Sequence, residues 1–160
     1  MKTQSGFLEP EKQMYFMQQA IEQAKIAYKK DEVPVGAIIV KSETGEILSR
    51  QYNRTIELSD PTAHAEILAI REVCKKLGNY RINNCDLYVT LEPCTMCASA
   101  ISWARINNVC FGAYDKKFGA VVSNLKFFEQ SFCNHKINIS SGILKDECSE
   151  LLKNFFKERR

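Results

Sequence analysis

Two short segments of the chain carry residue types that bind and use metal ions: residues 64–66 (His-Ala-Glu) and 93–97 (Pro-Cys-Thr-Met-Cys). An imidazole and two thiols are suitable ligands for zinc, which prefers four donors in a tetrahedron. Three protein ligands, His64, Cys94 and Cys97, leave one position for water, and zinc lowers the pKa of such a water to about 7. Glu66 follows the histidine closely enough to move protons for that water. The spacing therefore predicts a hydrolytic zinc centre.

Two other interpretations of these segments are weaker. The pair Cys94 and Cys97 could be a redox-active CxxC motif, but Pro93 precedes it and a His-x-Glu lies upstream. The zinc could instead be purely structural, which requires a fourth protein ligand. The only other histidine, His135, has no partner at ligand spacing, so we expect it to be a hydrogen-bonding or surface residue.

Alternating helical and strand patterns must position these segments. The hydrophobic periodicity predicts helices over residues 10–30, 61–77, 93–105, 123–129 and 144–160, and strands over 37–40, 46–52, 86–91, 108–112 and 136–140. The first two strands form an antiparallel hairpin, whereas strands joined through helices are expected to pair in parallel. The expected fold class is α/β, a three-layer α/β/α arrangement with a mixed five-stranded sheet.

Both metal-binding segments fall at the starts of predicted helices. Asp60 is the expected N-cap of one helix and Pro61 its first residue, which puts His64 in the first turn. Cys94 and Cys97 are spaced i and i+3, on one face of the first turn of the next helix. The positive end of a helix dipole favours thiolate over thiol, as zinc binding requires.

Length and composition indicate one globular domain over residues 1–160, with 45% hydrophobic and 26% charged residues. A net charge of +3 permits a nucleic-acid partner without requiring one. No apolar run is long enough to span a bilayer, and residues 1–10 lack the apolar core of a secretory signal. The seven cysteines show no disulfide framework, so we expect free thiols and a cytoplasmic location, with no membrane partner.

The combination of His-x-Glu with Pro-Cys-x-x-Cys is the signature of zinc deaminases that act on nucleobases. Further segments resemble the bacterial tRNA-specific adenosine deaminases, and the similarity runs from about residue 14 to the C-terminus. These segments are residues 32–37, 60–66, 87–94, 111–113, 134–135, 142–144 and 155–160.

The resemblance implies a cytidine-deaminase-like fold, one zinc ion per subunit, a homodimer, and conversion of adenosine to inosine at the wobble position of a tRNA anticodon stem-loop. It also implies that Asn53 contacts the target base, that the backbone of Ala65 helps to hold it, and that Asp115 lies beside the anticodon loop. Taken alone, Asn53 could be a turn residue after a strand, and Asp115 a solvated loop charge.

The end of the chain and one loop bear on the RNA partner. Lys153, Lys157, Arg159 and Arg160 accompany Phe155 and Phe156, a pattern that suits either RNA binding or an ordinary amphipathic helix. Tyr114 stands where the family often has arginine, and residues 118–123 are bulkier than the usual small-residue loop.

Two other functions remain open. Residues 100–105 resemble a segment of bacterial guanine deaminases, so the same chemistry could act on a free nucleobase or nucleoside, such as guanine or cytosine. A free-base enzyme needs a closed pocket, whereas an RNA enzyme needs an open groove with a basic rim. A non-catalytic zinc module that binds RNA is also conceivable, but it would have no use for Glu66.

Overall fold

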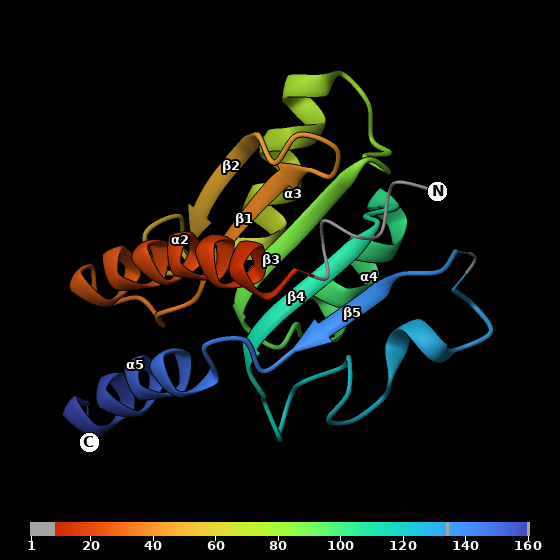
Figure 1. Ribbon diagram of the computed structural model, residues 1–160. Helices are drawn as coiled ribbons and strands as arrows, with labels where there is room; N and C mark the ends of the chain where they lie inside the picture. The colour runs from red at the N-terminus through yellow and green to blue at the C-terminus, as the bar shows by residue number, and fades with distance from the viewer. Residues whose placement is uncertain (1–8, 134, 160) are drawn as a thin grey trace.

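The computed structural model describes residues 9–133 and 135–159, which form an α/β/α arrangement around one mixed sheet (Figure 1). Helices α2 and α5 cover one face of the sheet, and α3 and α4 cover the other. The predicted fold class is therefore confirmed. The elements are α2 (Pro10–Lys29), β1 (Gly36–Lys41), β2 (Ile47–Tyr52), α3 (Ala65–Leu77), β3 (Cys85–Leu91), α4 (Thr95–Ala104), β4 (Asn108–Ala113), the 3₁₀ helix η1 (Phe127–Glu129), β5 (Asn138–Ser141) and α5 (Lys145–Glu158).

The five strands lie in the order β2-β1-β3-β4-β5. Strand β1 is antiparallel to both of its neighbours, β2 and β3, whereas β3, β4 and β5 are parallel. The parallel pairing of β3 with β4 across α4 agrees with the prediction. Strands β2 and β3 are also joined through a helix, α3, but they do not pair, because β1 lies between them.

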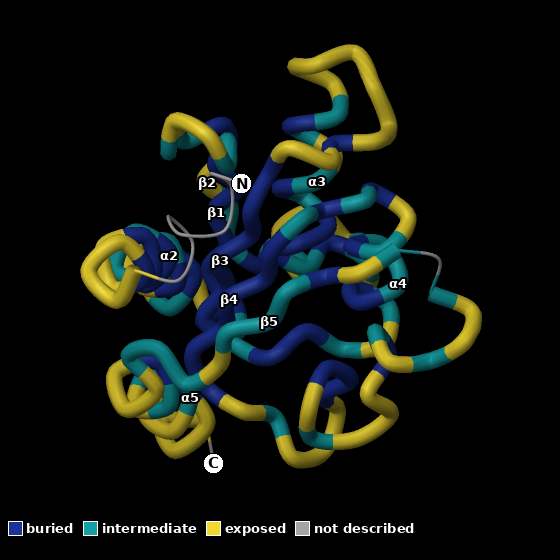
Figure 2. Tube along the Cα trace, turned by 45° about the vertical axis from the view of Figure 1, so that its right-hand side comes forward, coloured by how far each residue is buried: buried dark blue, intermediate teal, exposed yellow. Residues whose placement is uncertain are grey.

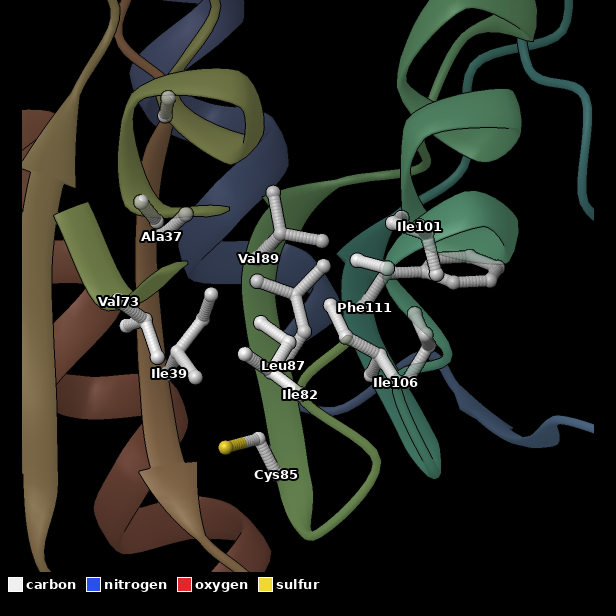
Figure 3. Packing of buried hydrophobic residues seen from close by; sticks show 14 of the residues in the cluster. Ala37, Ile39, Val73, Ile82, Cys85, Leu87, Val89, Ile101, Ile106 and Phe111 are labelled. Atoms are coloured by element: carbon white, nitrogen blue, oxygen red, sulfur yellow. The ribbon is translucent and has the colours of Figure 1, made fainter. Parts of the chain in front are cut away.

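Alternate residues of the strands build a core on each face of the sheet. In β1, Ile38 packs toward α2 and α5, while Ala37 and Ile39 pack toward α3 and α4. Figure 3 shows the second of these cores, in which Leu87 and Val89 of β3 meet the helical side chains. The three central strands β1, β3 and β4 are buried over almost their whole length, the edge strand β5 is only half-buried, and the outer faces of α2 and α5 are exposed (Figure 2).

Helix α2 approaches the sheet very closely at Gly36. A Cβ atom at this position would lie 2.0 Å from the carbonyl oxygen of Ala20 and 2.6 Å from the amide nitrogen of Ala24. Only glycine leaves room for the backbone of the helix here. This contact fixes the start of β1, where Val35 lies next to the pocket described below.

The start of α3 differs from the prediction. The Asp60 carboxylate accepts hydrogen bonds from the backbone N–H of Thr62, at 2.8 Å, and from its hydroxyl, at 2.7 Å. Asp60 therefore caps a turn, and the helix begins at Ala65 with His64 as its N-cap residue. The predicted end is confirmed, because Gly78 terminates the helix with a φ of 65°.

Two further predictions need correction, and two hold. Cys94 is the N-cap of α4, so the helix begins after Pro93 and Cys94. The helix predicted over 123–129 is reduced to η1. All seven cysteines are free, as predicted. Within the described residues, no helix has both the length and the apolar character needed to cross a membrane.

Candidate active site and metal centre

The N-terminal ends of α3 and α4 bring the three predicted metal ligands together. His64 is the N-cap of α3, Cys94 is the N-cap of α4, and Cys97 lies in the first turn of α4. The His64 Nδ1 atom is 3.7 Å from Cys94 Sγ and 3.5 Å from Cys97 Sγ. The three donor atoms all lie within 4.8 Å of one another.

These distances fit a zinc ion. With Zn–N and Zn–S bonds of about 2.0–2.3 Å, neighbouring donors of a tetrahedral site are about 3.6 Å apart. Across residues 9–133 and 135–159, this is the only cluster of three or more possible His, Cys, Asp or Glu ligands, and it contains no fourth member. The donor set is therefore that of a catalytic zinc site, with one position left over for water.

When no metal is bound, hydrogen bonds among the three predicted ligands shift their pKa values. A hydrogen bond from the Cys97 thiol, with help from His64, lowers the pKa of Cys94 to about 4 in spite of burial. The same bond to Cys94, together with burial, raises the pKa of Cys97. A hydrogen bond with Cys94 raises the pKa of His64. A metal ion binding here must displace protons from this cluster.

Glu66 lies in the first turn of α3, only 4% exposed, and lines the same pocket as His64 and Cys94. Burial raises the pKa of its carboxyl group to about 7. Its side chain hydrogen bonds with Cys97 but does not belong to the ligand cluster. Ala65, fully buried beside it, is the first residue of the helix, so its N–H has no partner within the helix.

The metal site opens into a cavity of about 540 Å³. This volume is within the range of sites that hold small organic molecules, and most of its lining is apolar. Val35 and Leu91 form part of the wall, and Met96 of α4 contributes another apolar side chain. The remaining walls come from the loops that follow β2 and β4.

Two of the three residues predicted to bind the substrate, Asn53 and Asp115, lie on these two loops. Asn53, 6% exposed, follows β2, lines the pocket and donates its backbone N–H to the carbonyl of Val35 at 3.0 Å. Asp115 follows β4 and also lines the pocket. Its Oδ1 accepts hydrogen bonds from the N–H groups of Lys117, at 3.1 Å, and Phe118, at 3.0 Å. Asp115 is therefore a turn-capping residue at the rim of the pocket.

Sequence reasoning missed two buried carboxylates that hold these loops. Glu32, 1% exposed, accepts the N–H groups of Ile56, at 3.1 Å, and Glu57, at 2.7 Å. Glu92, 2% exposed, binds the loop after β4. Burial alone would raise the pKa of Glu92, but hydrogen bonds from Ser123 and other loop groups hold it below its ordinary value. In both cases the sequence offered one signal of a buried carboxylate: the acidic residue stands next to a run of apolar residues.

The segment after β4 carries two bulky aromatic side chains, Tyr114 and Phe118, of which only Phe118 lines the pocket. Tyr114 packs edge-on against Phe111, with ring centroids 5.3 Å apart, and its hydroxyl donates to Ser141 Oγ at 2.9 Å. Phe118 lines the pocket and is 61% exposed. The expected departure from a small-residue loop is thus visible as an aromatic rim.

The C-terminal helix is amphipathic, with one of its two phenylalanines buried and the other exposed. Phe155 is buried, with the guanidinium of Arg159 stacked 3.5 Å from its ring centroid and ion-paired with Asp31. Phe156 is 49% exposed, so only this ring is free to meet a partner. Arg160, predicted to add to the basic patch, lies outside the described residues, as does Asn134 of the similar segments.

The second histidine, His135, lies away from the metal cluster. Its Nδ1 is 3.3 Å from an Arg105 nitrogen, and its Nε2 is 3.3 Å from the Ile106 carbonyl oxygen. The prediction of a hydrogen-bonding residue is confirmed.

Three candidate metal ligands lie at two helix ends, with a buried carboxyl group beside them, in an α/β/α fold. This arrangement is that of a metal-dependent hydrolytic deaminase. Residues 10–113 match the family model of the cytidine and deoxycytidylate deaminase zinc-binding region. The chain belongs to this zinc-dependent deaminase family and, within it, groups with the tRNA-specific adenosine deaminases.

Three relatives define the position of the chain within the family. It is 50% identical over 146 residues to the tRNA-specific adenosine deaminase of Agrobacterium fabrum, which covers 91% of this chain and 95% of the relative. A solved structure from a study of A-to-I editing by tRNA:A34 deaminases at the wobble position is 50% identical, has a TM-score of 0.83, and covers 86% of this chain and 99% of the other. The guanine deaminase of Bacillus subtilis is 30% identical, with a TM-score of 0.61 over 91% of this chain and 92% of that enzyme.

Proposed function

We propose that this protein hydrolyses adenosine to inosine at the wobble position of tRNA, using one zinc ion per subunit. The observation that carries the proposal is the three-ligand cluster of His64, Cys94 and Cys97, with Glu66 buried in the same pocket. The 50% identity to tRNA-specific adenosine deaminases over nearly the whole chain supports the choice of substrate. We assign this activity to a single domain that comprises residues 1–160.

In this proposal His64, Cys94 and Cys97 hold the zinc ion, which when bound supplies Lewis-acid activation of water at neutral pH. Overall, the oxygen of water replaces the amino group at C6 of adenine, and ammonia leaves. Glu66 takes the two protons of the water one after the other at a carboxylate oxygen. It delivers the first to the ring nitrogen and the second to the departing amine, so that inosine and ammonia are formed. In the metal-free site, burial raises the pKa of Glu66 to about 7, and proton transfer in both directions is most efficient for a group that titrates near the working pH.

Three groups are proposed to hold the target nucleotide. The amide of Asn53 provides both a donor and an acceptor at the pocket wall. The free N–H of Ala65, at the positive end of α3, provides a donor near the reacting ring. Asp115 stands at the rim, beside the path of the anticodon loop.

Exposed lysines favour RNA over a free base, two of them next to the rim residue Asp115 and two on α5. Lys116 and Lys117 are exposed next to Asp115, and Lys153 and Lys157 are exposed on α5. Such side chains can contact phosphates along an RNA strand. Because the proposed substrate is tRNA, and because the cysteines are free, we propose a cytoplasmic location.

We further propose that the protein is a homodimer, associated through the outer face of α4. This ten-residue helix has no charged residue, and Trp103 on its outer face is 71% exposed. A surface helix that carries no charged residue and exposes a tryptophan usually has a partner. Phe132, 58% exposed, extends the same apolar surface.

The test is to incubate the zinc-loaded protein with a tRNA anticodon stem-loop bearing adenosine at the wobble position and, separately, with free guanine, cytosine and adenine. We expect inosine in the RNA and no ammonia from the free bases. Ammonia from guanine without inosine would favour the second candidate, a guanine deaminase, for which the 30% identity to the Bacillus subtilis enzyme is the specific observation. Bound zinc with no release from any substrate would favour a non-catalytic module.

A further inference from the structure

One buried carboxylate next to the metal centre belongs to neither the ligand set nor the proton transfer. Glu92 lies between β3 and the Pro93-Cys94 turn and is 2% exposed. A carboxylate in such a place is costly unless hydrogen bonds replace its water. Glu92 receives them from one loop, residues 115–123, which we call the rim loop.

The rim loop is bound to Glu92 at both of its ends. The N–H of Asp115, at the start of the loop, donates to Oε1 at 3.1 Å. At its end, the N–H groups of Val121, Val122 and Ser123 donate to Oε2 at 3.1, 2.8 and 2.9 Å. The Ser123 hydroxyl donates to Oε1 as well. A single side chain thus satisfies five donors of the loop.

The middle of the rim loop also lies directly against this carboxylate. A Cβ atom at Gly119 would be 2.4 Å from the Cδ of Glu92, so only glycine allows the approach. Gly119 forms a β-bridge with the metal-ligand residue Cys94, and the N–H of Ala120 donates to the carbonyl of Pro93 at 2.9 Å. The loop is therefore held against the segment that contains a metal ligand.

The rim loop supplies Asp115 and Phe118 to the pocket, whereas the metal cluster and Glu66 stand on α3 and α4. A nucleotide that reacts at the metal centre while still part of a strand must continue past this rim. The position of the rim relative to Cys94 should therefore affect how the neighbouring nucleotides are held, and much less how the bond at C6 is hydrolysed.

We propose that Glu92 is a positioning residue that sets the rim loop at a fixed distance from the metal centre and thereby determines the affinity for the RNA around the target adenosine. The inference rests on the proposed function of the protein. Glu92 also lines the pocket, but both of its carboxylate oxygens accept hydrogen bonds from the rim loop, so we assign its effect on the substrate to the loop.

The experiment compares the zinc-loaded wild type with the variants Glu92→Gln and Gly119→Ala. The first replaces one acceptor oxygen by an NH₂ group that faces N–H donors, and the second displaces the loop while the carboxylate is kept. The matched control is Asp86→Asn at the other end of β3, where a carboxylate that is 4% exposed accepts hydrogen bonds from Ser42 and Asn108, away from the pocket. Zinc content, melting temperature, kcat and KM for the anticodon stem-loop are measured for each protein.

We expect both test variants to retain zinc and to raise KM about tenfold, the scale of a lost hydrogen bond to a charged group, with kcat within about threefold of wild type. The control should lower the melting temperature without changing KM. Hydrogen exchange of residues 115–123 should become faster in Glu92→Gln and Gly119→Ala, and should not change in Asp86→Asn.

The inference is overturned if Glu92→Gln and Gly119→Ala leave KM unchanged, whether or not exchange in the loop increases, or if they lower only kcat. If Glu92→Gln does not fold or loses zinc, Gly119→Ala alone decides the result, because it retains every ligand and Glu92 itself. Failure of the proposed function is a separate outcome: the wild type would then form no inosine in the stem-loop, while the exchange measurement would still report whether Glu92 holds the loop.

Discussion

The substitution Glu66→Gln should affect activity and stability in opposite directions. Glutamine has the shape of glutamate but cannot exchange a proton, and the carboxylate does not belong to the metal-ligand cluster. Zinc content should therefore be unchanged. General acid–base catalysis contributes about 10²–10⁴-fold, and one group that serves both proton transfers should fall at the upper end of this range. We expect kcat to fall by about 10⁴-fold.

The stability change follows from burial. The Glu66 side chain is 4% exposed, and burial raises its pKa from the ordinary 4.5 to about 7. This difference corresponds to about 3 kcal/mol of free energy. Because the folded protein holds the proton more tightly than the unfolded chain, the cost is absent below pH 4.5, grows as the pH rises to 7, and is constant above it. In metal-free protein, Glu66→Gln should therefore raise the unfolding free energy by up to about 3 kcal/mol at pH 8 and very little at pH 5.

Two measurements check this reasoning: single-turnover inosine formation with zinc-loaded protein, and urea unfolding of chelator-treated protein at pH 5 and pH 8. The matched control is Glu72→Gln on the same helix, α3, where the carboxylate accepts hydrogen bonds from Ser49 and Gln51 away from the pocket. This control should keep its activity and lose stability. Normal turnover by Glu66→Gln would refute its role in proton transfer, and an equal loss of stability at both pH values would make it a structural residue.

Three other predictions concern the metal, the core and the assembly. Zinc affinity, measured by competition with a chelator, should rise about tenfold per pH unit for each proton displaced, because the raised pKa of Cys97 keeps its thiol protonated in the metal-free site; a pH-independent affinity would contradict this. Gly36→Ala should lower the unfolding free energy by about 3 kcal/mol or more in urea titrations, since its Cβ would lie 2.0 Å from the Ala20 carbonyl oxygen; an unchanged midpoint would show that α2 can shift freely. Trp103→Glu should shift the protein toward monomer in light scattering while the fold, followed by circular dichroism, is retained; an unaltered mass would place the interface elsewhere.

The candidate metal ligands could be predicted because the residues of each motif lie close together in the sequence. His64 and Glu66 are two residues apart, and Cys94 and Cys97 are one helical turn apart, so chemistry and spacing are both readable in the sequence. Periodicity also located the strands and the main helices. The start of α3 could not be read in this way, because Asp60 can cap either a helix or a turn, and its bonds to Thr62 decide for the turn.

The features that could not be predicted depend on contacts between distant segments. The insertion of β1 between β2 and β3 is a matter of strand order, on which local hydrophobic patterns carry no information. The helix predicted over 123–129 is reduced to η1 for a similar reason. The N–H groups of Val121, Val122 and Ser123 turn toward Glu92, about 30 residues earlier in the chain, and so the loop is held by that carboxylate.

The pocket draws its reactive groups from two helix ends and its outer walls from loops that follow β2 and β4. These sources lie apart in the chain, but the loop after β4 is tied to the start of α4 by Glu92 and by the bridge between Gly119 and Cys94. An engineer seeking a new base preference should therefore vary the exposed side chains of the two loops, such as Phe118, and keep Glu92, Gly119 and both helix starts intact.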